Sequence, residues 1–229
     1  TVFPGDFRYK KANLSSTINH RSENGRFGIS LSTSYTHEDN KLPTVDFTGN
    51  AYSLEPNAPE LYDTDGNLNW ENNTWDNPLA ALEEEYAAVS KTLISNAVVS
   101  YKIMDHLELK SSLGFTSYQL DTHRAMPSSA TNPMYGLTPQ NYSYLMTNAS
   151  QRESWIIEPQ LNWKNEWDSF SMDILLGTTF QQETTEQLVL RGRGFPNNGL
   201  LYNLGAAQNI DILSNADGEY RYNAIFGRV

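Results

Sequence analysis

The sequence predicts an all-β protein whose antiparallel strands form a segment of a transmembrane β-barrel. Three observations predict this class: long runs of alternating apolar and polar residues, short turns that join these runs in pairs, and long irregular segments between the pairs. In residues 93–103 the alternation covers eleven residues. That exceeds the ~5–6 of an average globular strand and fits the ~9–11 that a tilted strand needs to cross a bilayer.

About seven strands are expected, and tight turns join the first six into three hairpins. The turn Ser22–Gly25 contains Asn-Gly, the strongest two-residue hairpin signal, and Met104–His106 and residues 165–169 make the other two turns. The last strand runs to the end of the sequence. In chain order, the expected strands are residues 8–20, 26–38, 92–103, 107–119, 153–164, 170–190 and 219–229.

Three long segments, at about residues 39–91, 121–150 and 191–217, separate the hairpins and are expected to be loops. The first is predicted to contain one short helix from about Pro78 to Val89, with Asn77 as its N-cap and the proline at its first position. Loops of this size are uncommon in compact domains and usually carry function.

Short connections at one end of the strands and long ones at the other are typical of outer-membrane barrels. The interpretation places the apolar side chains of each strand against lipid and their small polar neighbours towards a hydrated interior. Aromatic residues near both strand ends are expected to form two interfacial girdles. They are Phe27, Trp163, Trp167 and Phe170 beside the tight turns, and Tyr35, Tyr118 and Phe180 near the long loops. The same aromatics would also suit the core of a soluble β-sandwich.

The composition excludes several other classes. The 229 residues are 38% hydrophobic, with a mean hydropathy of −0.56, and no run of ~18 apolar residues exists, so a helical membrane protein is excluded. A net charge of −11 argues against a nucleic-acid partner. The sequence starts without Met or a signal peptide and stops within an alternating run, which predicts that it belongs to a longer chain.

Several stretches resemble one family, the SusC and RagA-like branch of TonB-dependent outer-membrane transporters of Bacteroidetes. The resemblance rests on LYDTDGNLNWENNTWDNPLAAL at residues 61–82, NAVVSYKIMDHLELKSSLGF at residues 96–115 and YRYNAIFGRV at residues 220–229. It implies a barrel of roughly 22 strands with a plugged lumen. It further implies a SusD-like lipoprotein lid and import of oligosaccharides or peptides, driven by the TonB complex. No plug or TonB-contact segment is recognisable here, so the chain is expected to supply barrel wall and outer loops.

Candidate ligand contacts lie in the long loops. Trp70 and Trp75 could stack on the apolar faces of sugar rings, and Tyr135, Tyr142 and Tyr144 form a similar aromatic group in the second loop. The alternative is that all five pack the loops against their neighbours or against the lid.

A metal site and an enzyme have weaker support. Asp63, Asp65 and Asn67 have the spacing that begins a calcium loop, but the rest of that pattern is missing and an Asp-Gly turn explains the same residues. No catalytic or metal-binding motif is present, so we expect neither an enzyme nor a cofactor. The leading interpretation is an outer-membrane nutrient importer, most simply of oligosaccharides. The alternatives are a soluble all-β carbohydrate-binding module or surface adhesin, and a secreted glycoside hydrolase.

Overall fold

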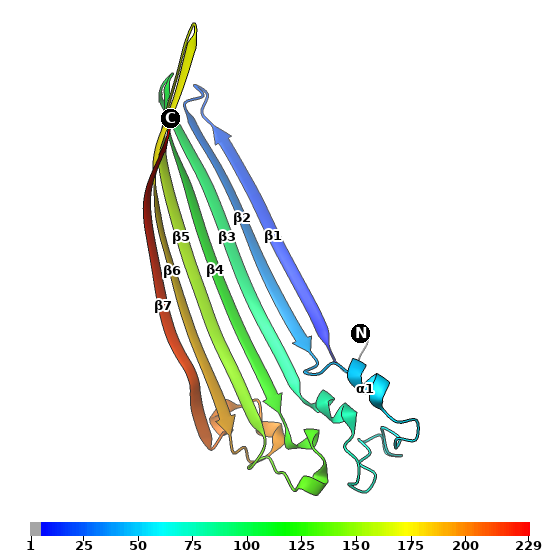
Figure 1. Cartoon of the computed structure of the whole chain (residues 1–229). Helices are drawn as coiled ribbons and strands as arrows, with labels where there is room; N and C mark the ends of the chain where they lie inside the picture. Colours follow the sequence, from blue (N-terminus) through cyan, green and yellow to red (C-terminus); the bar gives the residue numbers. More distant parts are fainter. Residues whose placement is uncertain (1–5) are drawn as a thin grey trace.

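The computed structural model describes residues 6–229 and shows seven antiparallel strands in one sheet (Figure 1). Each strand pairs with its neighbours in sequence, and β1 and β7 do not pair with each other, so the described sheet is open. The strands are β1 (Arg8–Arg21), β2 (Phe27–Leu42), β3 (Glu85–Met104), β4 (Leu107–Met126), β5 (Tyr144–Trp167), β6 (Phe170–Arg193) and β7 (Asn209–Arg228). The helices are α1 (Thr48–Ser53) and the 3-10 helices η1 (Pro78–Glu83), η2 (Ser128–Ala130), η3 (Pro133–Tyr135), η4 (Asn198–Leu200) and η5 (Leu204–Ala206).

The predicted hairpins are confirmed, but the strands continue beyond the predicted limits. The loops cover residues 43–84, 127–143 and 194–208, where the alternation predicted about 39–91, 121–150 and 191–217. The paired backbones continue to Leu42 opposite Tyr86 and to Met126 opposite Tyr144. Hydrogen-bonded pairing of backbones does not require apolar side chains. The sheet therefore extends past the point where the apolar pattern stops.

The predicted helix from Pro78 to Val89 is shorter than expected and is a 3-10 helix that ends at Glu83. Its start is confirmed, because the Asn77 side chain accepts a hydrogen bond from Leu79 N at 2.9 Å. Residues 85–89 instead begin β3, where they pair with β2 on one side and β4 on the other. Pairing with neighbouring strands therefore overrides the helical preference expected for these residues.

The two faces of the sheet have different chemistry. Residues directly opposite each other on paired strands share a face, so the register defines rows that cross the sheet. One row is apolar and comprises Ile18, Leu31, Ala97, Leu113, Ile157 and Phe180. The adjacent row, on the other face, comprises Thr17, Ser32, Asn96, Gly114, Ile156 and Gln181. We call these the apolar face and the polar face.

The apolar face forms a band of nearly constant height. It covers nine residues on each central strand, namely 93–101 on β3, 107–115 on β4 and 155–163 on β5. At ~3.3 Å per residue and a tilt of ~40°, this is about 23 Å, close to the ~25 Å apolar band of membrane barrels. Its limit on the side of the loops shifts by two residues between β3 and β4 and again between β5 and β6, as tilted strands require. The large side chains of the band are exposed, including Leu14 at 74% and Leu176 at 56%.

Beyond the band, towards the loops, the same face becomes polar. The row of residues there comprises His37, Lys91, Gln119, Gln151, Glu186 and Asp217. The expected girdles are partly corrected. Phe27, Trp163, Tyr35 and Phe180 lie on the apolar face, but Tyr118 pairs with Thr92 on the polar face. The face on which an aromatic side chain lies is therefore set by the pairing register of its strand. Its distance from a loop does not determine this face.

Apolar burial is concentrated at one place in the described residues. Phe195 and Leu201, in the loop of residues 194–208, pack against Ala125 and Leu145 at the loop end of β4 and β5. All four are at most 3% exposed. This loop therefore folds back onto the wall, above the apolar band. No helix among residues 6–229 has the length and apolar character needed to cross a membrane.

Candidate functional site

Two buried asparagines order the first loop and tie it to the second. Asn77, which is 3% exposed, donates from Nδ2 to the carbonyl oxygens of Leu61 at 2.6 Å and Asn69 at 3.0 Å. Asn132, which is 2% exposed, donates from Nδ2 to the carbonyl oxygens of Trp75 at 3.1 Å and Asn73 at 3.4 Å. Buried amides of this kind are costly to leave unpaired, so they fix the loops in one arrangement.

The second loop is tied in turn to the third. Ser143, only 1% exposed, accepts from Ser128 N at 2.8 Å and donates to Asn198 Oδ1 at 2.7 Å. Gln140 Nε2 donates to the Pro196 carbonyl at 2.9 Å. The three loops thus form one connected assembly, which we call the loop cap (residues 43–84, 127–143 and 194–208).

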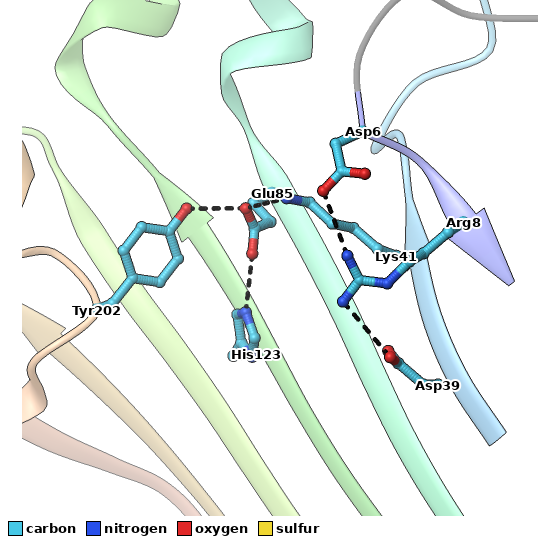
Figure 2. A network of polar contacts seen from close by, with 7 residues as sticks. All are labelled: Asp6, Arg8, Asp39, Lys41, Glu85, His123 and Tyr202. Carbon is cyan, nitrogen blue, oxygen red and sulfur yellow. Dashed lines mark hydrogen bonds and ion pairs between the residues drawn. The ribbon is translucent and has the colours of Figure 1, made fainter. Parts of the chain in front are cut away.

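A polar network centred on Glu85 attaches the loop cap to the strands (Figure 2). Glu85 receives Lys41 Nζ at 2.8 Å, His123 Nε2 at 3.2 Å and the Tyr202 hydroxyl at 3.1 Å, from β2, β4 and the third loop respectively. Burial and the neighbouring Glu85 carboxylate raise the pKa of Tyr202 to about 12. The phenol is therefore neutral at physiological pH and can donate. Beside this network, Arg8 bridges Asp6 at 3.3 Å and Asp39 at 3.4 Å.

Three of the five predicted aromatic residues lie at or beside one turn of the first loop. The backbone N–H of Trp75 donates a hydrogen bond to the backbone carbonyl of Trp70 at 3.3 Å, which closes a tight turn. Its residues Glu71, Asn72 and Asn73 all have positive φ. Tyr135, 53% exposed, reaches this turn from the second loop by donating to Asp76 Oδ2 at 3.0 Å, and this bond raises its pKa.

The other two predicted aromatics lie elsewhere. Tyr144 is the first residue of β5 and pairs with Met126 and Arg193. Tyr142 is half-buried, and its burial, followed by the nearby carboxylate of Glu84, raises its pKa. The aromatic candidates therefore form two groups rather than one platform.

Asp63, Asp65 and Asn67 form a closed turn. The carboxylate of Asp63 accepts from the backbone N–H of Asp65 at 2.9 Å and of Asn67 at 2.8 Å. These bonds, led by that from Asn67, hold the Asp63 pKa below its usual value. Within residues 6–229, no three His, Asp or Glu side chains are arranged to hold a metal ion. A calcium role for this turn stays a prediction.

A pocket that the sequence did not predict opens on the polar face at the base of the loop cap. It has a volume of about 380 Å³. Its lining residues come from two adjacent rows of the polar face and from the start of the first loop, namely Leu42, Pro43, Thr44, Tyr86, Thr122, Arg124, Met146, Asn148 and Val189. The available signal was the continued alternation of Thr122, Arg124 and Met126, which the interpretation assigned to a loop.

Arginines mark this end of the polar face. Arg124 pairs with Glu84 at 3.0 Å, while Arg191 and Arg193 share Asp211 at 3.2 and 2.9 Å. Two carboxylates thus face three guanidinium groups. This is an excess of positive charge in a chain whose net charge is −11. Such a surface favours groups that accept hydrogen bonds or carry negative charge.

Comparison with known proteins finds similar solved structures, but no family model and no curated protein matches the sequence. A chain of the RagAB peptide importer in its open-open state aligns with a TM-score of 0.70 and 15% identity, covering 96% of this chain and 25% of that one. The closed-closed state aligns with a TM-score of 0.69, at 15% identity over 96% of this chain and 26% of that one.

This chain thus spans about a quarter of the length of the importer chains that it matches. The alignment covers nearly the whole described sheet together with its loops. At 15% identity the likeness concerns the fold. The seven-stranded sheet and its loop cap have the fold of a segment of the RagAB importer chains.

Proposed function

We propose that this chain forms part of the barrel wall and outer loops of a TonB-dependent nutrient importer in the bacterial outer membrane. The observation that carries the proposal is the apolar band, which is about nine residues tall on the central strands and exposed on one face of a single sheet. Lipid is the solvent that suits such a face, since contiguous exposed apolar surface is rare on soluble monomers.

The soluble alternatives fit less well. A carbohydrate-binding sandwich or an adhesin buries its apolar face under a second sheet. In residues 6–229 no second sheet covers the apolar band, and its Leu, Ile and Trp side chains are more than a third exposed at most positions. A secreted glycoside hydrolase would also have to bury this apolar band, so the exposed band argues against that class too.

The partners follow from the resemblance and from the structural likeness. A SusD-like lipoprotein would close over the loop cap, and the TonB complex would act through a plug region carried by the rest of the protein. The cargo would be an oligosaccharide or a peptide; the aligned importer is described as a peptide importer. The turn that carries Trp70 and Trp75, joined by Tyr135, would be a first contact for cargo or lid.

Two adjacent valines provide a matched test of membrane orientation. Val99 lies on the apolar face opposite Ile29, whereas Val98 lies on the polar face opposite Ser30. In the complete protein, Val99→Asp should abolish assembly into the outer membrane, and Val98→Asp should leave it largely intact. Separation of membranes, followed by heat-modifiable electrophoresis, measures assembled barrel. Equal loss in both variants, or wild-type protein in the aqueous fraction, would contradict the proposal.

A further inference from the structure

The pocket on the polar face lies well above the apolar band. Arg124, in its wall, is nine residues beyond Phe115, the last band residue of β4. At ~3.3 Å per residue this is about 30 Å along the strand. The pocket therefore opens into the watery mouth of the interior, beneath the loop cap, where cargo would enter.

Most of the accessible surface of the pocket is apolar. Leu42, Pro43, Met146 and Val189 provide apolar surface from β2, β5, β6 and the first loop, and Tyr86 is the one aromatic side chain. Sugar rings carry hydroxyls around their rims and need many polar partners when bound. A cavity of this composition suits an aliphatic or thioether side chain better than a pyranose ring.

Hydrogen-bonding groups in the lining of the same pocket include those of Thr44, Thr122, Arg124 and Asn148. Arg124 is held by Glu84 through Nη2, but its Nε has no hydrogen-bond partner within the described chain, and neither does the hydroxyl of Thr44. Both atoms are shielded from solvent, but the Arg124 side chain as a whole is 39% exposed, so a ligand in the pocket can reach its guanidinium group. Unpaired buried donors are unfavourable, and a ligand that supplies an acceptor would remove that cost.

We infer that this pocket is a subsite for a short peptide. It takes one apolar side chain against Met146, while a carboxylate or carbonyl oxygen of the peptide accepts from Arg124. The inference rests on the proposed importer function and narrows its cargo from oligosaccharide or peptide to peptide. Neutral and acidic glycans are the competing cargo classes.

The test uses the complete protein, purified in detergent from outer membranes. It is offered a tryptic casein digest together with malto-oligosaccharides and oligogalacturonates, and mass spectrometry identifies what remains bound after washing. Peptides should be retained by the wild type. Arg124→Met, which removes a charge-assisted bond, and Met146→Trp, which fills the cavity, should each lower retention roughly tenfold or more.

Arg152→Met is the matched control, because Arg152 makes an ion pair with Glu183 at 2.7 Å outside the pocket. It should change retention less than about twofold, well below the cost of losing a bond to a charged group. Where Met146→Trp fails to assemble, Val189→Phe fills the same cavity from β6. Equal retention by wild type and both pocket variants would overturn the inference. So would retention of either glycan class in place of peptides, or an equal loss in Arg152→Met.

An uptake assay separates failure of the subsite from failure of the proposed function. Wild-type cells should take up a captured peptide, and deletion of TonB should abolish uptake. If uptake by the wild type depends on TonB but is unchanged in Arg124→Met and Met146→Trp, the importer stands and the subsite fails. If the wild type shows no TonB-dependent uptake of peptide or glycan, the importer proposal itself fails.

Discussion

The hydroxyl of Tyr202 donates a hydrogen bond of 3.1 Å to Glu85 Oε2, joining residues 117 positions apart in the chain. The tyrosine belongs to the third loop, and the glutamate is the first residue of β3. The rings of His123 and Tyr202 are nearly perpendicular, with their centroids 6.0 Å apart. The bond between Tyr202 and Glu85 therefore attaches the third loop to the sheet, next to the apolar cluster around Phe195.

Removal of the Tyr202 hydroxyl should loosen the third loop without unfolding the sheet. We expect Tyr202→Phe to cost about 1 kcal/mol of local opening free energy, because one bond to a charged group is lost at a partly exposed site. Hydrogen exchange of amides 194–208 measures it, and amides 93–101 serve as the internal reference. Tyr52→Phe, at an 89% exposed position of α1, is the control and should leave both segments unchanged. Unaltered exchange in Tyr202→Phe would show that the apolar cluster and the hydrogen bonds to the second loop hold the third loop without this contact.

The pH dependence of this attachment follows from the raised pKa of Tyr202. Its folded pKa is about 12, against an ordinary value of 10.0. A proton bound more tightly in the folded state stabilises that state fully below pH 10, and the contribution is lost as pH rises through about 12. Protection of amides 194–208 should therefore persist to pH 10 and then fall. In Tyr202→Phe this fall should be absent, and a fall of the same size in both proteins would refute the assignment.

The side chain of Asn132 should contribute strongly to the local stability of the loop cap, because it joins the second loop to the first. Asn132→Ala leaves the carbonyl oxygens of Trp75 and Asn73 without their side-chain donor at a site only 2% exposed. We expect a loss of roughly 1–3 kcal/mol in local stability. Limited proteolysis between residues 61 and 77 measures it, with the exposed Asn57→Ala as control. Cleavage at the same rate in Asn132→Ala and wild type would show that the first two loops do not depend on this amide.

The role of Trp70 in cargo contact can be tested by comparison with a tryptophan at the other end of the strands. Trp70→Ala should weaken binding of the captured cargo roughly three- to tenfold if stacking contributes ~0.5–1.5 kcal/mol. Trp167 lies beside a tight turn, where its ring stacks on that of Phe170 with the centroids 5.3 Å apart. Trp167→Ala should therefore leave cargo binding unchanged. Calorimetry on the complete protein distinguishes the two. An effect of the same size for both tryptophans would remove the aromatic turn from the proposed entry site.

The hairpins, the strand faces and the loop order could be predicted because each depends on residues close in sequence. Alternation around Val99 identified both the strand and the side chain that lies on the apolar face. It failed at the strand ends because the apolar pattern stops with the band, whereas backbone pairing continues for eleven further residues on β4, to Met126. The pocket lies in that continuation, so it was missed.

The loop cap depends on contacts that local patterns do not encode. Asn132 meets the Trp75 carbonyl across 57 positions, and Ser143 meets Asn198 across 55. Nothing near either residue in the sequence indicates its partner. Tyr118 was placed on the wrong face for a related reason, since the direction of a strand side chain is set by register with its neighbours and not by proximity to a loop.

Gly177 on β6 is a place where an added side chain would collide with a neighbouring ring. A Cβ there would lie 2.5 Å from Phe226 Cζ and 2.7 Å from its Cε2, because the Phe226 ring lies over the glycine from the opposite position on β7. Gly177→Ala should therefore displace that ring and cost roughly 1–3 kcal/mol, as overpacking does. Gly218 on β7 has its nearest atom at 4.0 Å, so Gly218→Ala is the matched control and should be nearly neutral.

The heat-modifiable fraction of the complete protein, measured across a urea series, reports both changes. If the urea midpoint falls in Gly177→Ala but not in Gly218→Ala, the Phe226 ring packs closely against Gly177 in the assembled protein as well. Equal midpoints in the two variants would mean that the Phe226 ring swings aside freely. In that case the β6–β7 pair would be held by its backbone ladder rather than by the ring.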